Sequence, residues 1–414
     1  MVTDTRIADA ALPEGVETAY AWRRLLVSLV ISTIGGIGLW SAIVVLPAIQ
    51  AEFGIERATA SLPYTATMLG FAGGGILMGR LADRFGIILP VILGAVALGI
   101  GYLAAAHATS LWQFAVAQGL VIGLCGSSAT FGPLVADVSH WFTRNRGMAV
   151  GICASGNYLS GTIWPPVLQH FVAAVGWRET HIGIGIFCVA TMLPLALALR
   201  RRTPVAHAVP VTGAVRRGAG AAPIPPRTLQ AMLVVAGFGC CMAMSMPQVH
   251  IVAYCGDLGY GPARGAEMLS LMLGLGVVSR LGSGWISDRI GGVPTLLLGS
   301  ALQCLTLFLY LPFDSLVSLY VVSALFGLSQ GGIVPSYAMI IREHFPAREA
   351  GTRVGIVLMA TIIGMAAGGW ASGAIFDVTG SYQAAFVNGI LWNLLNLAIA
   401  VWLLGQPRGR AVPA

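Results

Sequence analysis

Long apolar runs follow one another along most of this chain, and they constrain its fold more than any other feature. A helix needs about 20 consecutive apolar residues to cross the roughly 30 Å hydrocarbon core of a bilayer. Charged residues make up only 9% of the 414 residues, whereas soluble globular proteins carry about 25%. So few charges cannot cover a surface that faces water. The chain is therefore expected to be an all-α integral membrane protein.

The apolar runs predict twelve transmembrane helices in two groups of six. We expect the spans at 25–47, 61–80, 88–107, 111–136, 147–170, 180–199, 229–254, 265–286, 293–311, 315–341, 352–375 and 382–404. Residues 200–228 are basic and rich in proline, glycine and alanine, which is typical of a linker. The predicted domains are a tail (1–24), a six-helix bundle (25–199), the linker (200–228), a second six-helix bundle (229–404) and a tail (405–414).

The distribution of basic residues predicts the orientation of the chain. All 23 basic residues are arginines, and the cytoplasmic loops of membrane proteins carry an excess of basic residues. If the N-terminus is cytoplasmic, only Arg57, Arg178 and Arg264 lie outside. Both termini are therefore predicted to be cytoplasmic, in a bacterial-type inner (plasma) membrane. The net charge of +7 then reflects this topology next to anionic lipid, so that no nucleic-acid partner is expected.

The two groups of six spans resemble each other. Residues 79–86 (GRLADRFG) follow the second span and residues 284–291 (GWISDRIG) follow the eighth, and both have the form Gly-x3-Asp-Arg-x-Gly. Glycine pairs of the form Gly-x3-Gly also open the fifth span, at 147–151, and the eleventh, at 351–355. The two halves are thus predicted to be parallel repeats, which place a substrate site at their interface near the middle of the membrane.

This pattern resembles the major facilitator superfamily, over residues 20–405. The resemblance implies two pseudo-symmetric six-helix bundles and a cytoplasmic gate. In the family, the signature aspartate bonds to the start of the fifth or eleventh helix and closes the cytoplasmic side. Carried over, Asp83 is expected to meet the helix that starts near Arg146, and Asp288 the helix that starts near Arg353. Helix N-termini favour carboxylates.

The residues that the resemblance assigns to the cytoplasmic gate are Gly79, Asp83, Arg84, Gly86, Arg146, Gly284, Asp288, Arg289, Gly291 and Arg353. In one respect the chain departs from the family. The family signature usually continues with basic residues, whereas residues 87–88 here are Ile-Ile and residues 292–293 are Gly-Val. The gate is therefore expected to have fewer charge contacts than usual.

Arg280 interrupts the eighth apolar run. It lies eight residues before Asp288, which is roughly 12 Å deeper along a helix and close to the middle of the membrane. A charge at that depth is costly unless it faces a cavity or a partner. None of the predicted spans has an Asp or Glu in its interior. An anion that binds and leaves is the remaining candidate for the partner of Arg280, and a structural arginine bonded to helix carbonyls is the alternative.

The segment around Arg280 also resembles the eighth helix of the monocarboxylate porter and oxalate/formate antiporter group, in which an arginine four residues before a glycine binds the substrate carboxylate. Arg280 and Gly284 have this spacing. The proton-coupled porters typically have an Asp one turn before the arginine, where this chain has Gly276. They also use a lysine in the first helix, and this chain contains no lysine. A single buried cation fits a monoanion, and coupling to a proton or to a counter-anion both stay open.

Other polar residues within the spans could complete a substrate site. The predicted substrate-binding residues are Arg280, Asn157, Tyr158, Gln330, Ser127, Ser128, Tyr64 and His250. For each of the others, helix packing or an interfacial position is the alternative. His250 is the protonatable group nearest the predicted pathway, and the pKa range of histidine suits a proton carrier.

The favoured function is secondary active transport of a small organic anion by a monomer in the lipid bilayer. Efflux of amphipathic drugs is the first alternative, although drug exporters often bury a carboxylate. A membrane enzyme is the second, but the sequence contains no metal-ligand cluster, nucleophile elbow or phosphate-binding loop, so that no catalytic residue, cofactor or metal is expected. A receptor with a transporter fold is the third.

Overall fold

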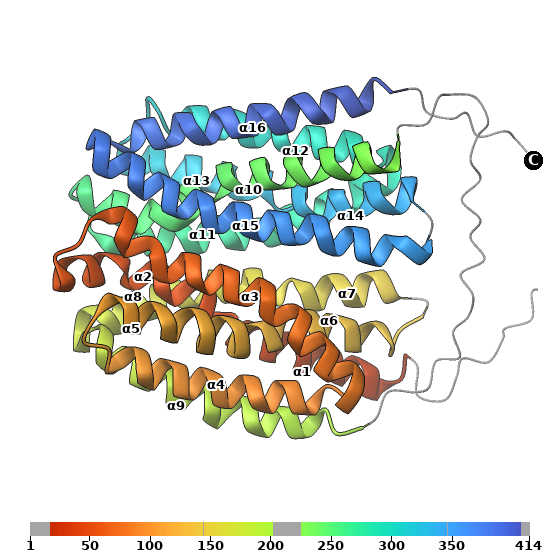
Figure 1. Ribbon diagram of the computed structural model, residues 1–414, viewed down its shortest axis with the longest axis horizontal. Coiled ribbons are helices and arrows are strands. Elements are labelled where there is room, and N and C mark those ends of the chain that lie inside the picture. The colour runs from red at the N-terminus through yellow and green to blue at the C-terminus, as the bar shows by residue number, and fades with distance from the viewer. Residues whose placement is uncertain (1–16, 144, 202–224, 346, 407–414) are drawn as a thin grey trace, which may run out of the picture.

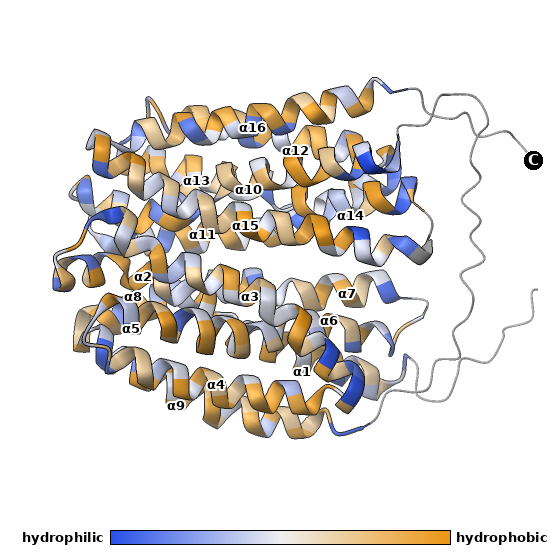
Figure 2. Cartoon of the chain, viewed as in Figure 1, coloured by the Kyte–Doolittle hydropathy of each residue, from blue (hydrophilic) through white to orange (hydrophobic). Residues whose placement is uncertain are grey.

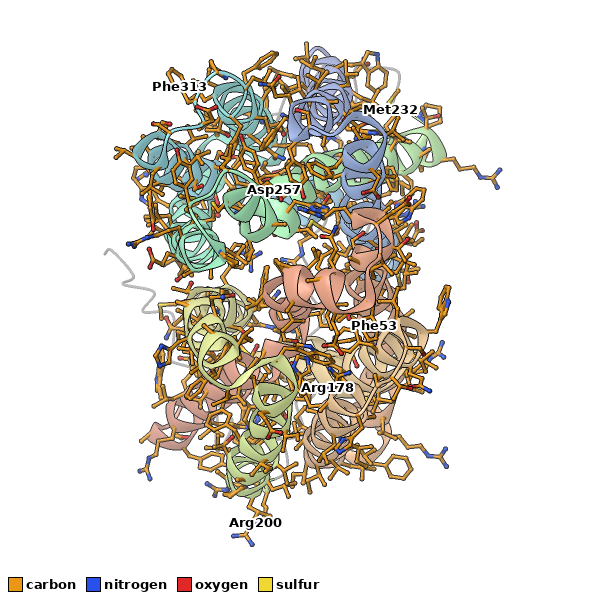
Figure 3. All side chains as sticks on the ribbon, turned by 90° about the vertical axis from the view of Figure 1, so that its left-hand side faces the viewer. Phe53, Arg178, Arg200, Met232, Asp257 and Phe313 are labelled. Carbon is orange, nitrogen blue, oxygen red and sulfur yellow. The ribbon has the colours of Figure 1, made fainter. Side chains whose placement is uncertain are left out.

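The computed structural model describes residues 17–143, 145–201, 225–345 and 347–406, and the chain is helical throughout these ranges apart from short connections. The helices run side by side in two groups, α1 to α9 and α10 to α16 (Figure 1). The start of α1 and the ends of α9 and α16 lie at the right-hand end of Figure 1. We call this end the terminus side and the opposite end, which faces the viewer in Figure 3, the far side.

The first half consists of α1 (Ala19–Gly35), α2 (Ile37–Phe53), α3 (Arg57–Phe85), α4 (Ile88–Ala106), α5 (Leu111–Val116), η1 (Ala117–Gly126), η2 (Ser127–Thr130), α6 (Gly132–Ser139), α7 (Arg146–Ala154), α8 (Gly156–Val175) and α9 (Trp177–Ala198). The second consists of α10 (Pro226–Asp257), α11 (Pro262–Ile290), α12 (Gly292–Leu309), α13 (Leu316–Gln330), α14 (Ile333–His344), α15 (Ala347–Thr379) and α16 (Tyr382–Leu404).

Each of the twelve predicted spans lies on a helix or on consecutive helices, so the predicted fold class is confirmed. Ten stretches of the described chain are long and apolar enough to cross a membrane by themselves. The spans of α3 and of α7–α8 do not meet this measure, because glycine, serine, threonine and proline take the place of larger apolar residues. Figure 2 shows apolar residues along the helix bodies and hydrophilic residues mainly near the helix ends.

The predicted linker and tails lie largely outside the described residues. Most of the linker predicted at 200–228 does so, as do residues 1–16 of the first tail and 407–414 of the last. Where the chain is described, α1 begins at Ala19, within the predicted tail. The side chain of Thr18 caps this helix start, and Arg24, in the second turn, is buried in an ion pair with Asp137 of α6.

Four of the spans are interrupted, and small residues mark three of the interruptions. Gly36 separates α1 from α2, Ser155 separates α7 from α8, and residues 331–332 (Gly-Gly) separate α13 from α14. The fourth span changes from α-helix to a π-helical stretch and a short 3-10 turn between residues 117 and 130. A helix interruption leaves backbone carbonyls without their intrahelical donors. Polar side chains near an interruption can therefore donate hydrogen bonds to these carbonyls.

The two halves meet chiefly along two pairs of helices. α3 packs along α15, and α8 packs along α11, while α2 also packs against α10 and α11. Within the described residues, the hydrogen bonds that join the halves extend from the far side to Arg280 of α11, which donates to Ala154. The far side is therefore held closed, and Arg280 lies where the two halves begin to separate.

Candidate functional site

Arg280 lies between helix interruptions that belong to different halves. Its Nη1 donates to the carbonyl oxygen of Ala154, the last residue of α7, at 3.3 Å, and its Nε to that of Gly331, at 3.5 Å. The guanidinium carbon lies 4.4 Å from the ring centroid of Tyr158 in α8. Both acceptors are carbonyls that a helix interruption leaves available. The side chain is partly buried.

The guanidinium of Arg280 is not neutralised within the described part of the chain. Its two hydrogen bonds are long and use neutral acceptors, whereas a guanidinium offers five N–H donors. The two buried arginines of the described ranges, Arg24 and Arg57, by contrast have carboxylate partners, Asp137 and Asp257. Arg280 thus keeps both its charge and most of its donors available to an anion.

Tyr158 is packed against the helix that carries Arg280. A Cβ atom added at Gly276 would lie 2.5 and 2.7 Å from two ring carbons of Tyr158, a distance at which atoms collide. Gly276 therefore allows the ring to reach the guanidinium. Because Tyr158 fills this space, a carboxylate at position 276 is sterically excluded in this arrangement.

Replacing Gly276 with alanine is expected to lower stability by about 1–3 kcal/mol, the usual cost of overpacking. The matched control is Gly282→Ala on the same helix, where an added Cβ meets nothing within 4 Å. The thermal unfolding midpoint in detergent checks both. In the double variant, Tyr158→Leu should restore part of the unfolding midpoint that Gly276→Ala alone loses. Equal midpoints for Gly276→Ala and Gly282→Ala would disprove the contact.

Gln330 is brought to the same place as Arg280 and Tyr158. The side chain is fully buried, and its Oε1 accepts a hydrogen bond from Nε2 of Gln248 in α10. Its Nε2 has no partner among the described residues and lies 3.8 Å from where a Cβ of residue 276 would be. Gln330 also directly precedes Gly331, whose carbonyl accepts from Arg280. An unpaired donor therefore lies close to Gly276, the glycine against which the ring of Tyr158 packs.

Asn157 and Tyr64 also have buried polar atoms without partners in the described chain. These atoms are Oδ1 of Asn157 and the hydroxyl of Tyr64. Asn157 directly precedes Tyr158, and its backbone oxygen accepts from the indole of Trp40 at 3.3 Å. The ring of Tyr64 lies against Gly369 of α15, about 3.1 Å from the position of an added Cβ there. Each of the two predicted residues could accept or donate a hydrogen bond at the interface between the halves.

The other three predicted substrate-binding residues make contacts elsewhere. Ser127 donates to the carbonyl of Gly35 at 2.8 Å, and Ser128 donates to that of Leu124 at 2.6 Å. His250 is fully buried, with Nε2 at 2.7 Å from the carbonyl of Gly369 and Nδ1 at 3.1 Å from the hydroxyl of Tyr382. The structure shows no contact between these residues and Arg280. The hydrogen bonds of Ser127 and His250 join different helices, and that of Ser128 stays within its own span.

The two gate signatures end their helices as expected but have no partners on the terminus side. Gly86 and Gly291 follow α3 and α11 with φ of +83° and +87°, a conformation that glycine adopts without strain. Asp83 and Asp288 are exposed, and neither makes a hydrogen bond or ion pair with a described residue. An added Cβ would meet nothing within 4 Å at the gate glycines and helix starts, namely Gly79, Gly147, Gly284 and Gly351.

The gate arginines lie against side chains of their own half. Arg146 donates to Ser139 at 3.3 Å, and Arg353 to Glu349 at 2.9 Å. The guanidinium carbons of Arg84 and Arg289 lie 5.2 and 3.4 Å from the ring centroids of Phe85 and Trp285. These contacts within one half are compatible with a gate that is open on the terminus side.

The helix pairs predicted for the gate stay a prediction, because neither aspartate has a partner among the described residues. From the sequence, Asp83 of α3 is expected to meet the start of α7, and Asp288 of α11 the start of α15. The structure instead packs α3 along α15 and α11 along α8, which continues α7. The repeats are related by a symmetry that exchanges the halves, so each signature helix has its neighbour in the opposite half. In this packing, the helices that face α3 and α11 across the interface are therefore α15 and α8.

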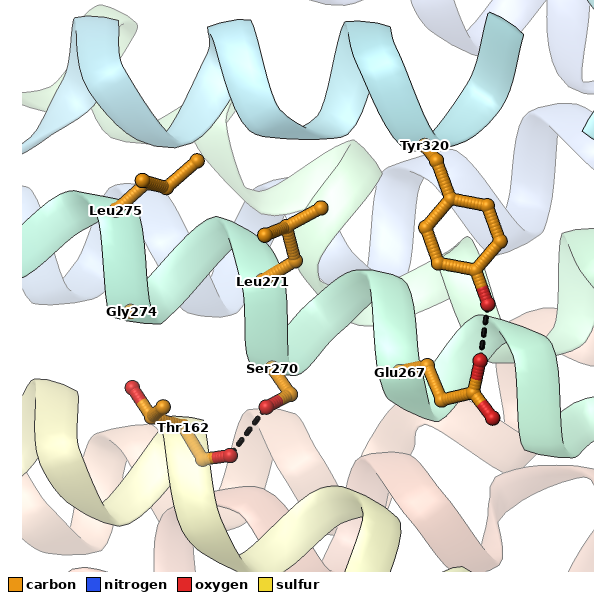
Figure 4. Close-up of a pocket in the computed structure, with 7 residues that line it drawn as sticks. All are labelled: Thr162, Glu267, Ser270, Leu271, Gly274, Leu275 and Tyr320. Atoms are coloured by element: carbon orange, nitrogen blue, oxygen red, sulfur yellow. Dashed lines mark hydrogen bonds between the residues drawn. The ribbon is translucent and has the colours of Figure 1, made fainter. Parts of the chain in front are cut away.

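A separate groove of about 450 Å³ lies between α8, α11 and α13. Figure 4 shows Glu267 hydrogen-bonded to Tyr320, and Ser270 to the backbone oxygen of Thr162. Glu267 is also paired with Arg264. Because the groove carries a carboxylate and no free cation among its lining residues, an anion site there is disfavoured.

Comparison with known proteins agrees with this arrangement. The sequence profile of the Major Facilitator Superfamily matches residues 28–352 and 268–414. "Monocarboxylate transporter 13" of Bos taurus is 30% identical over 74% of this chain and 71% of its own length. "MFS transporter asaE" of Aspergillus flavus is 26% identical over 74% of this chain and 68% of its own. Among solved structures, an inward-facing, occupied bacterial homolog of the human lysosomal transporter Spinster aligns with a TM-score of 0.73 at 16% identity, covering 96% of this chain and 100% of that one.

Proposed function

Because the chain belongs to the major facilitator superfamily, we propose that it is a secondary transporter that moves a small organic monoanion, a monocarboxylate, across the membrane by alternating access. The observation that carries the proposal is the guanidinium of Arg280, which has no carboxylate partner in the described chain and lies where the two halves separate. The related protein named a monocarboxylate transporter adds support.

The chemistry of the site favours a carboxylate with one negative charge. A planar guanidinium can bind a carboxylate through two parallel hydrogen bonds. Pairing with an anion also offsets the cost of a charge at this depth. One free cation neutralises one charge, so a dicarboxylate would bring an uncompensated charge into the site. The unpaired Nε2 of Gln330, near Gly276 one turn before Arg280, is a further donor.

We propose that the terminus side faces the cytoplasm, because most of the arginines in loops and at helix ends lie there. The structure then corresponds to an inward-facing state, since the hydrogen bonds between the halves extend only from the far side to Arg280. In the outward-facing state, Asp83 would cap the start of α15 and Asp288 the start of α7, which closes the terminus side.

Replacing either gate aspartate with asparagine is expected to weaken closure on the terminus side, because the amide lacks the charge that a helix N-terminus favours by about 0.3–1 kcal/mol. In inside-out vesicles, cysteine labelling at the start of α15 should therefore increase about twofold to fivefold for Asp83→Asn. Asp314→Asn, on the far side, is the control. If Asp83→Asn and Asp288→Asn both label like the control, neither aspartate forms the gate.

Efflux of amphipathic cations is the weaker candidate. It would favour a free buried carboxylate, and the buried carboxylate of Asp137 is occupied by Arg24. Uptake into proteoliposomes separates the two functions. Radiolabelled lactate, pyruvate, formate and a small aromatic acid are offered with and without a pH gradient, and the uncharged amide of each acid is the control. Uptake of an acid but not of its amide supports the proposal; transport of cationic compounds alone refutes it.

A further inference from the structure

The gate signature has a third copy, without its arginine, which lies on the far side. Residues 373–380 (GAIFDVTG) end α15 and have the form Gly-x3-Asp-x2-Gly, as residues 79–86 and 284–291 do. Only the arginine after the aspartate is missing, because position 378 is valine. Gly380 has φ of +67°, like the final glycines of the other two copies. The sequence pattern and the backbone conformation therefore both repeat.

In this third copy the aspartate is engaged. The carboxylate of Asp377 accepts hydrogen bonds from the backbone N–H groups of Arg57, at 2.8 Å, and Ala58, at 2.7 Å. These are the first two residues of α3, whose N–H groups have no partner within the helix. A carboxylate there is also stabilised by the helix dipole. Because α3 and α15 belong to different halves, this cap joins the halves.

The first glycine of the copy permits this contact. A Cβ at Gly373 would lie 2.9 Å from both the Cα and the N atom of Ala58, and backbone atoms at that distance cannot give way cheaply. The close approach of α15 to the start of α3 thus requires glycine at this position while the far side is closed.

The side chain of Arg57 adds a second connection between the halves. Its guanidinium donates to both oxygens of Asp257 in α10, at 3.0 and 3.1 Å, and to the hydroxyl of Tyr382 in α16, at 2.6 Å. Tyr382 also contacts His250. Arg57 is 7% exposed, whereas the side chain of Asp257 is 37% exposed, so water screens the ion pair in part. The start of α3 is therefore held by three helices of the other half.

We propose that residues 373–380 form the far-side gate, and that α3 and α15 cap each other in turn. Asp377 caps α3 while the far side is closed, and Asp83 caps α15 while the terminus side is closed. The two helices are antiparallel neighbours, so rocking the halves breaks one cap as it forms the other. The α8–α11 pair has only the terminus-side copy, since Ala173 stands three residues before Gly176 at the end of α8. The inference goes beyond the transported substrate and does not depend on it.

Cysteine labelling of the purified protein in detergent tests the far-side gate. A Thr65→Cys reporter lies at the contact of α3 with Ala366 of α15. A Gly355→Cys reporter lies on the terminus side, where an added Cβ would meet no atom within 4 Å. Asp377→Ala should raise the maleimide labelling rate at the first reporter roughly tenfold and lower it at the second. Gly373→Ala should act in the same direction. The parent protein, with its seven native cysteines, gives the background.

Two matched controls separate gating from general damage. Arg178→Gln breaks an ion pair with Glu52 that lies on the same side but within one half, and Gly183→Ala adds a Cβ where nothing is within 4 Å. With either control substitution, the labelling rate at each reporter should equal the rate in the reporter protein that carries no further substitution. Unchanged rates at the Thr65→Cys reporter in both Asp377→Ala and Gly373→Ala would overturn the proposal. So would rates that rise together at the two reporters, because that result indicates loosening of the fold.

Discussion

Replacing Arg280 with alanine is expected to abolish binding of the anion while the protein still folds. Removing one partner of a buried charge pair costs about 3–5 kcal/mol, which lowers affinity more than a hundredfold at 1.4 kcal/mol per decade. Without ligand, the variant should be about as stable as the wild type, since removing an uncompensated charge offsets the loss of two long hydrogen bonds to neutral carbonyls and of the contact with the ring of Tyr158. Arg280→Lys should be intermediate, because an ammonium keeps the charge but cannot form the two-bond fork.

Thermal shift measures this effect. Wild type and Arg280→Ala are heated with and without a candidate monocarboxylate, and Arg178→Ala serves as an arginine control away from the site. The wild type and the control should be stabilised by the acid, and Arg280→Ala should not respond. A structural role for Arg280 predicts the reverse: a lower unfolding midpoint without ligand, together with an unchanged response to the acid.

Replacing Arg24 with alanine is expected to have the largest effect on stability, a loss of about 3–5 kcal/mol. The guanidinium donates to both oxygens of Asp137, at 2.8 and 2.9 Å, and to the carbonyls of Leu199 and Arg201, each at 3.0 Å. Arg24 is 2% exposed. Its loss would leave a buried carboxylate uncompensated where three segments of the first half meet.

The thermal unfolding midpoint in detergent checks this prediction, and two further variants sharpen it. Combining Arg24→Met with Asp137→Leu should recover much of the loss, because removing both charges leaves neither unpaired. Arg178→Ala breaks a pair in which both side chains are 37% exposed, so it should cost at most about 1 kcal/mol. Equal midpoints for Arg24→Ala and Arg178→Ala would show that burial of the Arg24 pair contributes little.

The positions of the spans could be predicted from sequence because each apolar run must cross the same thickness of membrane. The significance of Arg280 could be predicted for a related reason, since a charge stands out in an apolar run whatever its neighbours are. Neither inference requires knowledge of which helices touch. This explains why the predicted spans agree with the structure, while the role of Arg280 in binding stays a prediction.

The partners of polar residues could not be predicted, because they depend on packing between distant helices. Ser127 and Ser128 lie at the predicted depth, but their hydroxyls bond to backbone carbonyls. Gln248 was missed although it is a polar residue in an apolar run, two positions before His250. The gate pairs were assigned within each half because sequence repeats reveal the symmetry of the halves but not which helices face across it. The copy at 373–380 could have been found by searching for the signature without its arginine.

Initial rates of uptake into proteoliposomes test the central claim most directly. The acid that stabilises the wild type most in the thermal-shift assay is supplied in radiolabelled form to vesicles that contain equal amounts of folded wild type or Arg280→Ala. The account predicts rapid, saturable uptake by the wild type and uptake by Arg280→Ala no faster than into vesicles without protein. Uptake by Arg280→Ala at the wild-type rate would contradict it, because the anion would then cross without the guanidinium of Arg280.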